Sequence, residues 1–322
     1  MTTDSITTRT GLDLSQVRSW LPRYGVYLAI VLLVLYNIFF TPYFLTWSNL
    51  RIQLIQVAPI VIVALGMALV IGTEGIDLSV GSVMALAAAF IPLYLGYGVV
   101  AAILASLLAG AVVGLINGVL VAKVGLQPIV ATLALFVGGR GLAVVISKGK
   151  LVDIRNDDFL YLGSGDLFGI PVLVWIAALL VGVVAFIVRR TVFGRRLLAV
   201  GGNRPATELA GLPVKRVLIT VYVLCSVLAS IAGLLSVARI QSSDASAVGL
   251  LIELSAITAV VVGGTPLTGG KVRVLGTVAG ALLMQLVIAT MIKHNLPPST
   301  TEIAQAVIIL IAVYVARERK SR

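Results

Sequence analysis

The sequence has little charge, one histidine and one cysteine. Only 11% of its 322 residues are Asp, Glu, Lys or Arg, against about a quarter in a soluble globular domain, and 59% are apolar. This composition excludes a water-soluble surface, and it also excludes intrinsic disorder. A single His and a single Cys exclude a disulfide framework and a metal site built from His and Cys ligands.

Apolar runs fill most of the chain, whose mean hydropathy is +1.10. A helix that spans a bilayer takes about 20 residues, so the chain has room for about ten spans joined by short loops. We therefore predict an all-α polytopic membrane protein with about ten transmembrane helices. The eighth and tenth runs are short for a span. In order, the predicted spans are residues 24–47, 50–72, 76–96, 98–122, 128–147, 170–188, 217–238, 251–264, 274–292 and 302–316.

The 24 Lys and Arg residues fall mostly on one side of this layout. With a cytoplasmic N-terminus, ten crossings return the C-terminus to the cytoplasm, and 17 basic residues then lie inside, six outside and one, Arg140, within a span. Such an excess is typical of cytoplasmic loops. It explains the net charge of +11 without nucleic acid as a partner, because no soluble basic domain is present to bind one. The predicted parts are a cytoplasmic segment 1–23, a transmembrane domain 24–316 and a cytoplasmic tail 317–322.

Two loops are long enough to have a function of their own. Residues 148–168 fall on the outer side and carry four Asp residues. Residues 189–216 are cytoplasmic and carry seven basic residues. The rest of the chain outside the predicted spans is short, so it has limited means for catalysis.

The basic loop contains signals for one short helix. Asn203 is a good N-cap, and Gly211 stands where a left-handed residue ends a helix. A helix of about seven residues is too short to be stable alone in water, so it needs a surface to lie on. It is either an interfacial hairpin that joins two spans or a docking helix for a soluble partner. Its apolar face consists of Ala206, Leu209 and Ala210.

A second glycine-rich stretch, TPLTGGKV (265–272), resembles a phosphate-binding loop only superficially. Such a loop needs Gly at its first position and Ser or Thr after the Lys, where this sequence has Thr265 and Val272. We reject ATP binding there and predict a tight turn between the eighth and ninth spans.

Three acidic residues lie in or beside the predicted spans. Asp77 and Glu253 each open a similar string, DLSVGSVMAL and ELSAITAVVV, one at an inner and one at an outer end. Inverted repeats produce this arrangement, which would pair the third span with the eighth. The alternative for both acids is a charge at a helix N-terminus. Glu74 is expected to face water at the inner mouth.

Other polar residues within or beside the spans are candidates for the translocation path. Arg140 lies in the middle of the fifth span, where it either pairs with an acid, Glu74 or Asp77 being the candidates, or lines a wet path. Asn117 and Gln127 are weaker candidates. Their side chains either line the path or form hydrogen bonds between helices. A tandem GxxxG pattern on the fourth span permits close helix packing, within the subunit rather than across a dimer. It consists of Gly110, Gly114 and Gly118.

Four stretches resemble the permease subunits of bacterial sugar ABC importers of the ribose, xylose and galactofuranose branch. They are ALGMALVIGTEGIDLSVGSVMALAAA (64–89), NGVLVAKVGLQPIVATLALFVGGRGLA (117–143), GRRLLAVGGNRPATELAGLPVKR (194–216) and ELSAITAVVVGGTPLTGGKVRVLGT (253–277). The combination is specific, and it covers the chain from about residue 50 onward. Glu74 departs from the resemblance, since the family is expected to have Gly there, and this weakens inference of the substrate.

The resemblance implies a type II-like importer fold in the bacterial inner membrane, with no cofactor or metal of its own. A second permease subunit, identical or paralogous, would complete the path. ATPase subunits on separate chains would dock below, and a periplasmic sugar-binding protein would deliver a monosaccharide or sugar derivative. Residues 201–211 would be the coupling helix region. The residues expected to couple to the ATPase are Gly201, Asn203, Ala206, Leu209 and Gly211.

Two other classes of function were weighed against an importer permease. The alternative is a self-sufficient proton-coupled secondary transporter or channel, for which Asp77 or Glu253 would be the coupling acid. A membrane enzyme is excluded, because no polar loop holds a His or Cys pair of base and nucleophile. We therefore expect a transport subunit without catalytic activity.

Overall fold

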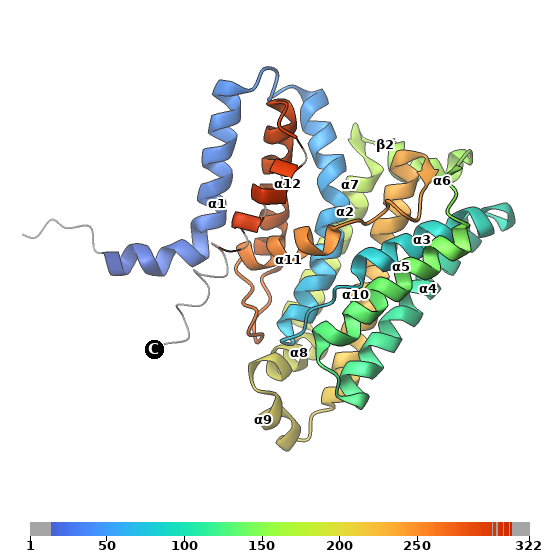
Figure 1. Ribbon diagram of the computed structural model, residues 1–322. Coiled ribbons are helices and arrows are strands. Elements are labelled where there is room, and N and C mark those ends of the chain that lie inside the picture. The colour runs from blue at the N-terminus through green and yellow to red at the C-terminus, as the bar shows by residue number, and fades with distance from the viewer. Residues whose placement is uncertain (1–13, 298, 301, 305, 309, 311–322) are drawn as a thin grey trace, which may run out of the picture.

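The computed structural model describes residues 14–297, 299–300, 302–304, 306–308 and 310, and most of this part is helical (Figure 1). The longer helices are α1 (Leu14–Phe40), α2 (Trp47–Gly72), α3 (Val80–Tyr94), α4 (Val99–Val119), α5 (Pro128–Ser147), α7 (Val172–Arg190), α10 (Val214–Ile240), α11 (Ile252–Val262) and α12 (Val274–Lys293).

Short elements connect them. The helical ones are η1 (Leu95–Tyr97), the π-turn η2 (Leu120–Val124), α6 (Asp157–Ser164), α8 (Val192–Gly202) and α9 (Arg204–Leu209). Two small antiparallel ribbons pair β1 (Val152–Asp153) with β4 (Ser242–Ser243), and β2 (Asp166–Leu167) with β3 (Ile170–Pro171).

Seven helices of the described part are long and apolar enough to cross a bilayer. They are α2, α3 with η1, α4 with η2, α5, α7, α10 and α12. The prediction of an all-α polytopic membrane protein is therefore confirmed, whereas ten crossings stay a prediction. The tenth predicted span, 302–316, lies mostly outside the described residues, as do most of segment 1–23 and all of tail 317–322.

Two predicted boundaries are wrong, each for a local reason, whereas the eighth predicted span, 251–264, agrees with α11 to within two residues and is short as predicted. The first helix ends at Phe40 rather than near residue 47, because residues 41–46 form a turn with Tyr43 at φ 59°. The third begins at Val80 rather than 76, because the Asp77 side chain accepts hydrogen bonds from Ser79 and holds a turn there. The eighth, α11, has 11 residues and is about 16 Å long, about half of a bilayer core.

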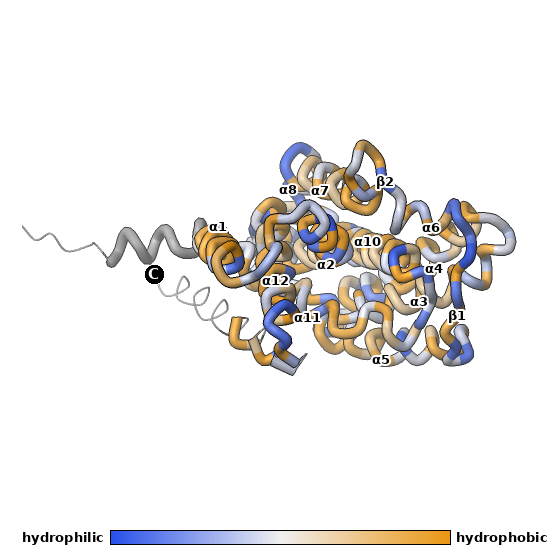
Figure 2. The backbone as a smooth tube through the Cα atoms, turned by 90° about the horizontal axis from the view of Figure 1, so that it is seen from above, coloured by the Kyte–Doolittle hydropathy of each residue, from blue (hydrophilic) through white to orange (hydrophobic). Residues whose placement is uncertain are grey.

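The core of the molecule lies along α2 and α10. Residues of α2 from Val57 to Gly72 are buried, and α10 packs against α2, α3 and α4. Seen from above, α2 and α10 lie inside the ring of other helices, and hydrophobic residues run along all of them (Figure 2). The other helices therefore pack around α2 and α10.

The two ends of the bundle differ. Helices α8 and α9 lie at one end, which we call the α9 end (Figure 1). Helix α6 and strand β2 lie at the other end, which we call the α6 end. The loop 148–168 is folded rather than open, because β1 pairs with β4 and α6 packs against α10 and α7.

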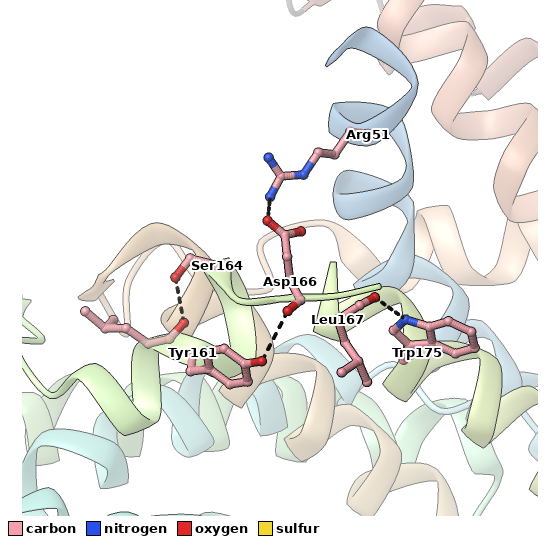
Figure 3. A network of polar contacts seen from close by, with 7 residues as sticks. Arg51, Tyr161, Ser164, Asp166, Leu167 and Trp175 are labelled. Atoms are coloured by element: carbon pink, nitrogen blue, oxygen red, sulfur yellow. Dashed lines mark hydrogen bonds and ion pairs between the residues drawn. The ribbon is translucent and has the colours of Figure 1, made fainter. Parts of the chain in front are cut away.

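A polar network fixes this loop to α2 (Figure 3). Arg51 of α2 forms an ion pair of 2.5 Å with Asp166 of β2, and the Tyr161 hydroxyl donates to the Asp166 carbonyl at 3.2 Å. The Trp175 indole of α7 donates to the Leu167 carbonyl at 3.1 Å. The α6 end is thus a structured surface.

The GxxxG pattern of α4 packs within the subunit, against α10, as predicted. A Cβ atom added at Gly114 would lie 2.7 Å from the Tyr222 carbonyl oxygen and 2.7 Å from the Val223 Cα. Gly110 and Gly118 meet α10 equally closely. These contacts bring two backbones together with no side chain between them.

We predict that Gly114→Ala lowers the free energy of unfolding by about 1–3 kcal/mol, because backbone atoms of α10 must move to admit the methyl group. Gly138→Ala in α5 is the matched control, since nothing lies within 4 Å of its Cβ position. It should leave stability unchanged or raise it by up to about 1 kcal/mol. Denaturation midpoints in detergent measure both. Equal effects would contradict the packing of α4 on α10.

Candidate functional site

The short helix α9 is built by the caps that the sequence predicts. The Asn203 side chain accepts a hydrogen bond of 3.0 Å from the Ala206 amide, and Gly211 has φ +75° just beyond the helix. The helix has six residues, one fewer than predicted. Inside the turn, the Thr207 hydroxyl donates to the Ala199 carbonyl of α8 at 2.9 Å. This bond holds a helix that is too short to be stable alone.

The outer face of α9 has no partner in the described part of the chain. Leu209 is 90% exposed, and Ala206 and Ala210 are exposed beside it. Exposed basic residues flank α9 on both sides in the sequence, and we call them, together with Arg204, the basic rim; Arg204 forms a weak 3.5 Å ion pair with Glu208. The others are Arg195, Arg196, Lys215 and Arg216. A strongly exposed leucine within a basic rim is suited to a partner with an apolar groove and acidic edges.

A junction of three glycines joins α8 to two other segments. A Cβ atom added at Gly201 would overlap the carbonyl oxygen of Gly72, at the end of α2, and lie 2.7 Å from the amide nitrogen of Gly270. The Gly270 amide donates to that same carbonyl at 3.0 Å. We call Gly72, Gly201 and Gly270 the glycine junction. The three backbones touch because none of these residues has a side chain.

The junction lies at the base of two short helices. Gly72 is followed by the non-helical segment 73–79, which leads into α3, and Gly270 belongs to the turn that follows α11. This turn has left-handed backbone at Gly269 and Gly270, as predicted for a tight turn. The end of α8 is therefore in backbone contact with both segments.

Glu74 also lies at this junction. Its backbone is left-handed, with φ 65°, and a Cβ atom at Gly269 would lie 2.9 Å from its amide nitrogen. Its side chain is exposed at the α9 end, and its position at a watery inner mouth stays a prediction. The left-handed φ explains why glycine is expected at this position.

Asp77 lies in a fully buried polar cluster before α3. Its carboxylate accepts from the Ser79 amide at 2.9 Å and from the Ser79 hydroxyl at 2.6 Å. Asn117 of α4 donates to the same hydroxyl at 2.8 Å, and Tyr222 and Cys225 of α10 lie near the carboxyl group. The structure therefore brings together two predicted site residues, Asp77 and Asn117. Asp77 precedes the helix and holds its start.

Arg140 does not contact Glu74 or Asp77, the partners that the sequence suggested. Its guanidinium donates to backbone carbonyls instead, to Val248 at 2.7 Å, Ala245 at 3.2 Å and Gly81 at 3.3 Å. These partners cannot be predicted from the sequence, because every residue has a backbone carbonyl group and none is marked as the acceptor. Arg140 thus joins α5, the segment before α11 and the first turn of α3.

The N-termini of α3 and α11 meet beside Arg140. A Cβ atom at Gly81 would lie 2.6 Å from the Glu253 carboxylate and would overlap the Gly249 carbonyl. Glu253 is buried in the first turn of α11, as expected for an acid at a helix N-terminus. Gln127 lies apart, exposed at the start of α5 with no capping hydrogen bond. Among the described residues, no three of His, Cys, Asp and Glu form a group that could hold a metal.

The sequence analysis missed a polar cavity of about 500 Å³ at the α6 end. None of the predicted path residues lines it. A signal was present, since Gln53 and Gln56 lie three residues apart in α2 and Gln285 lies in the apolar α12. The polar lining residues are Gln56, Ser236, Arg239, Ser242, Asp244 and Gln285.

Comparison with known proteins assigns the family. Residues 49–313 match the family described as branched-chain amino acid transport system, permease component. The chain belongs to this permease family. It is therefore a multi-pass membrane transport subunit that does not itself carry out catalysis.

Several curated relatives of this permease transport sugars, by their names. It is 40% identical to the galactofuranose transporter permease protein YtfT of Escherichia coli over 82% of this chain and 78% of the relative. It is 38% identical to the ribose import permease protein RbsC of Escherichia coli over 94% of this chain and 96% of the relative. It is 37% identical to the L-arabinose ABC transporter permease protein AraH of Azospirillum brasilense over 87% of this chain and 83% of the relative. No solved structure matches the permease significantly.

The glycine junction predicts a sharp difference between two neighbouring glycines of the permease. Gly201→Ala should lower the free energy of unfolding by about 1–3 kcal/mol, because the added methyl group overlaps the Gly72 carbonyl. In Gly202→Ala the nearest atom is the Gly270 Cα at 4.0 Å, so stability should be unchanged. Thermal unfolding in detergent measures both. If both variants unfold alike, the junction is not close-packed.

The left-handed φ of Glu74 gives a second prediction. Glu74→Gly should not lower the unfolding temperature, because relief of about 1–2 kcal/mol of left-handed strain offsets the flexibility of glycine in the unfolded chain. Glu74→Val should destabilise the permease by at least about 1 kcal/mol, because a β-branched residue resists this conformation. The same thermal assay measures both. A stable Val variant would show that residue 74 does not need positive φ.

Proposed function

We propose that the chain is the transmembrane permease subunit of an ATP-driven importer for a neutral monosaccharide or sugar derivative. The observation that carries this proposal is the exposed apolar face of α9 with its basic rim, attached to the membrane helices through the glycine junction. Relatives named for galactofuranose, ribose and arabinose transport support the cargo class.

In this proposal the protein lies in the inner membrane, with the α9 end and both termini in the cytoplasm. The excess of Lys and Arg in loop 189–216 supports the orientation. The domain is a single permease unit of residues 24–316, flanked by segment 1–23 and tail 317–322. The outer loop 148–168, held by Arg51 and Asp166, would face a periplasmic sugar-binding protein.

The partners follow from the same layout. One or two ATPase subunits would receive the coupling residues in a groove at the cytoplasmic side, and a second permease, identical or paralogous, would complete the path within the lipid bilayer. Asn203 and Gly211 would shape the helix, Ala206 and Leu209 would fill the groove, and Gly201 would transmit movement. ATP-driven closure would then alternate access between the two sides.

An inverted repeat would explain how movement at the glycine junction reaches the middle of the membrane. A long buried helix is followed by a non-helical segment and a shorter helix twice, in α2–α3 and in α10–α11. α3 runs away from the glycine junction, while α11 runs towards it, so the short helices have opposite directions. Broken helices in such repeats place helix N-termini near the middle of the membrane in many transporters.

The six path candidates have distinct roles in this mechanism. Arg140 and Glu253 would hold the meeting point of the two short helices, and Asp77 with Asn117 would fix the start of α3. Glu74 and Gln127 would line the inner mouth. When the junction is displaced, the Arg140 hydrogen bonds to Val248 and Gly81 would break and open a path between α3 and α11.

We expect Leu209→Glu to abolish ATP-dependent sugar uptake while leaving folding intact. The side chain is 90% exposed in the free subunit, so the change costs little stability, but it places an unpaired charge in an apolar groove. Uptake and ATP hydrolysis are measured in proteoliposomes that contain the permease, its ATPase and the sugar-binding protein. Leu45→Glu, which is exposed in the turn between α1 and α2, is the control and should retain coupling.

The proposal fails under either of two results. One is wild-type uptake and sugar-stimulated ATP hydrolysis in the Leu209→Glu variant. The other is uphill uptake by the permease alone in a proton gradient, which would support a self-sufficient secondary transporter instead.

A further inference from the structure

The polar cavity at the α6 end has no role in the coupling mechanism, although its walls come from many parts of the chain. Its volume is about 500 Å³, within the range of small-molecule sites. Residues from α2, α3, α10, α12 and the segment before α11 line it. It therefore lies between the two long buried helices and α12, in the half of the bundle away from α9.

One wall consists of side-chain amides. Gln285 of α12 is only 4% exposed, and its amide nitrogen donates to the Gln56 carbonyl oxygen at 2.7 Å and to the Gln53 carbonyl oxygen at 2.9 Å. Each amide has two donor hydrogens and an acceptor oxygen with two lone pairs. These bonds fix the amides in place while leaving further hydrogen-bonding capacity on Gln56 and Gln285.

The opposite wall carries one charge of each sign. Within the described part of the chain, the buried Nε of Arg239 has no hydrogen-bond partner. Asp244 accepts from the Ser246 amide at 2.8 Å and the Ser246 hydroxyl at 2.5 Å, and these bonds lower the pKa of its carboxyl group. Asp244 is therefore an anion at neutral pH, and the charges of the lining residues sum to zero.

The mixture of donors and acceptors determines the kind of molecule that fits. A hydroxyl group both donates and accepts, so a molecule with several hydroxyls can use the amides, the guanidinium and the carboxylate together. An anion would be repelled by Asp244 and a cation by Arg239, because like charges are poorly screened away from bulk water. The lining therefore favours a neutral polyhydroxylated solute over an ion.

We propose that this cavity is the outer binding site through which the cargo, a neutral sugar, enters the permease, with Asp244, Arg239, Gln56 and Gln285 as its specificity-determining residues. This inference rests on the proposed function. The floor of the cavity includes Val248 and Gly249. Arg140 donates a hydrogen bond of 2.7 Å to the Val248 carbonyl, and Gly249 contacts Gly81 of α3. The site thus ends where the N-termini of α3 and α11 close the path.

Transport kinetics test the site in the complete transporter with labelled ribose, arabinose, galactose and fructose as probes. For the sugar that is transported, Asp244→Asn and Gln285→Leu should raise the KM of uptake about tenfold, because each removes hydrogen bonds to the sugar. Glu302→Gln, which changes an exposed acid outside both the cavity and loop 148–168, should leave KM unchanged. Unchanged KM in both cavity variants would overturn the proposal.

Thiol labelling tests occupancy without relying on transport by a variant. Ala247→Cys is placed on the exposed rim of the cavity, in a Cys225→Ala background, and treated with a membrane-impermeant maleimide. Millimolar amounts of the transported sugar should slow its labelling at least about threefold and should not affect Ser164→Cys, which is exposed outside the cavity at the same end. Equal rates with and without sugar at Ala247→Cys would overturn the site.

The two proposals fail in different ways. If the transporter takes up a sugar with ATP, but neither KM nor labelling changes, the proposed function holds and the cavity is not its binding site. If none of the four probes is taken up in the presence of ATPase and binding protein, and none slows labelling, both proposals are overturned.

Discussion

Three backbones meet at the α9 end with no side chain between them. The Gly72 carbonyl receives a hydrogen bond from Gly270 and lies against the Cα of Gly201, so the end of α2, the end of α8 and the turn after α11 are in direct contact. Side chains can change rotamer and absorb a displacement, whereas backbones in contact must move together. In the proposed mechanism, this contact is what would let the six-residue helix α9 affect the interior of the membrane domain.

The interior is arranged so that such a movement has an effect. α3 and α11 are short helices whose N-termini meet near Arg140, and Arg140 holds them through carbonyl groups rather than through a fixed ion pair. Several separate hydrogen bonds in a small area can be exchanged one at a time, although each is strengthened by the charge of the guanidinium. On one side of this point is the polar cavity, and on the other is the exposed Glu74 at the base of the bundle.

Local features of this structure were predictable, and contacts between distant segments were not. The apolar runs give the helices to within a few residues, and the caps Asn203 and Gly211 were identified because each acts on its own backbone. The GxxxG pattern predicts a packed face, although only the structure shows that α10 occupies it.

The prediction failed where a single residue acts across the fold. Gly201 and Gly270 are far apart in sequence, and nothing in either stretch indicates the other. The partners of Arg140 are carbonyls, which no sequence pattern reveals, and the search for an acidic partner therefore gave the wrong residues. The cavity was missed because its amides come from α2 and α12 and its charges from the region around the end of α10.

Hydrogen–deuterium exchange of the complete transporter tests the central claim most directly. The account predicts that trapping the ATPase in its ATP-bound state changes amide exchange in residues 73–81 and 263–273 together with that in α8 and α9. A change confined to α8 and α9, with both segments unaffected, would contradict it.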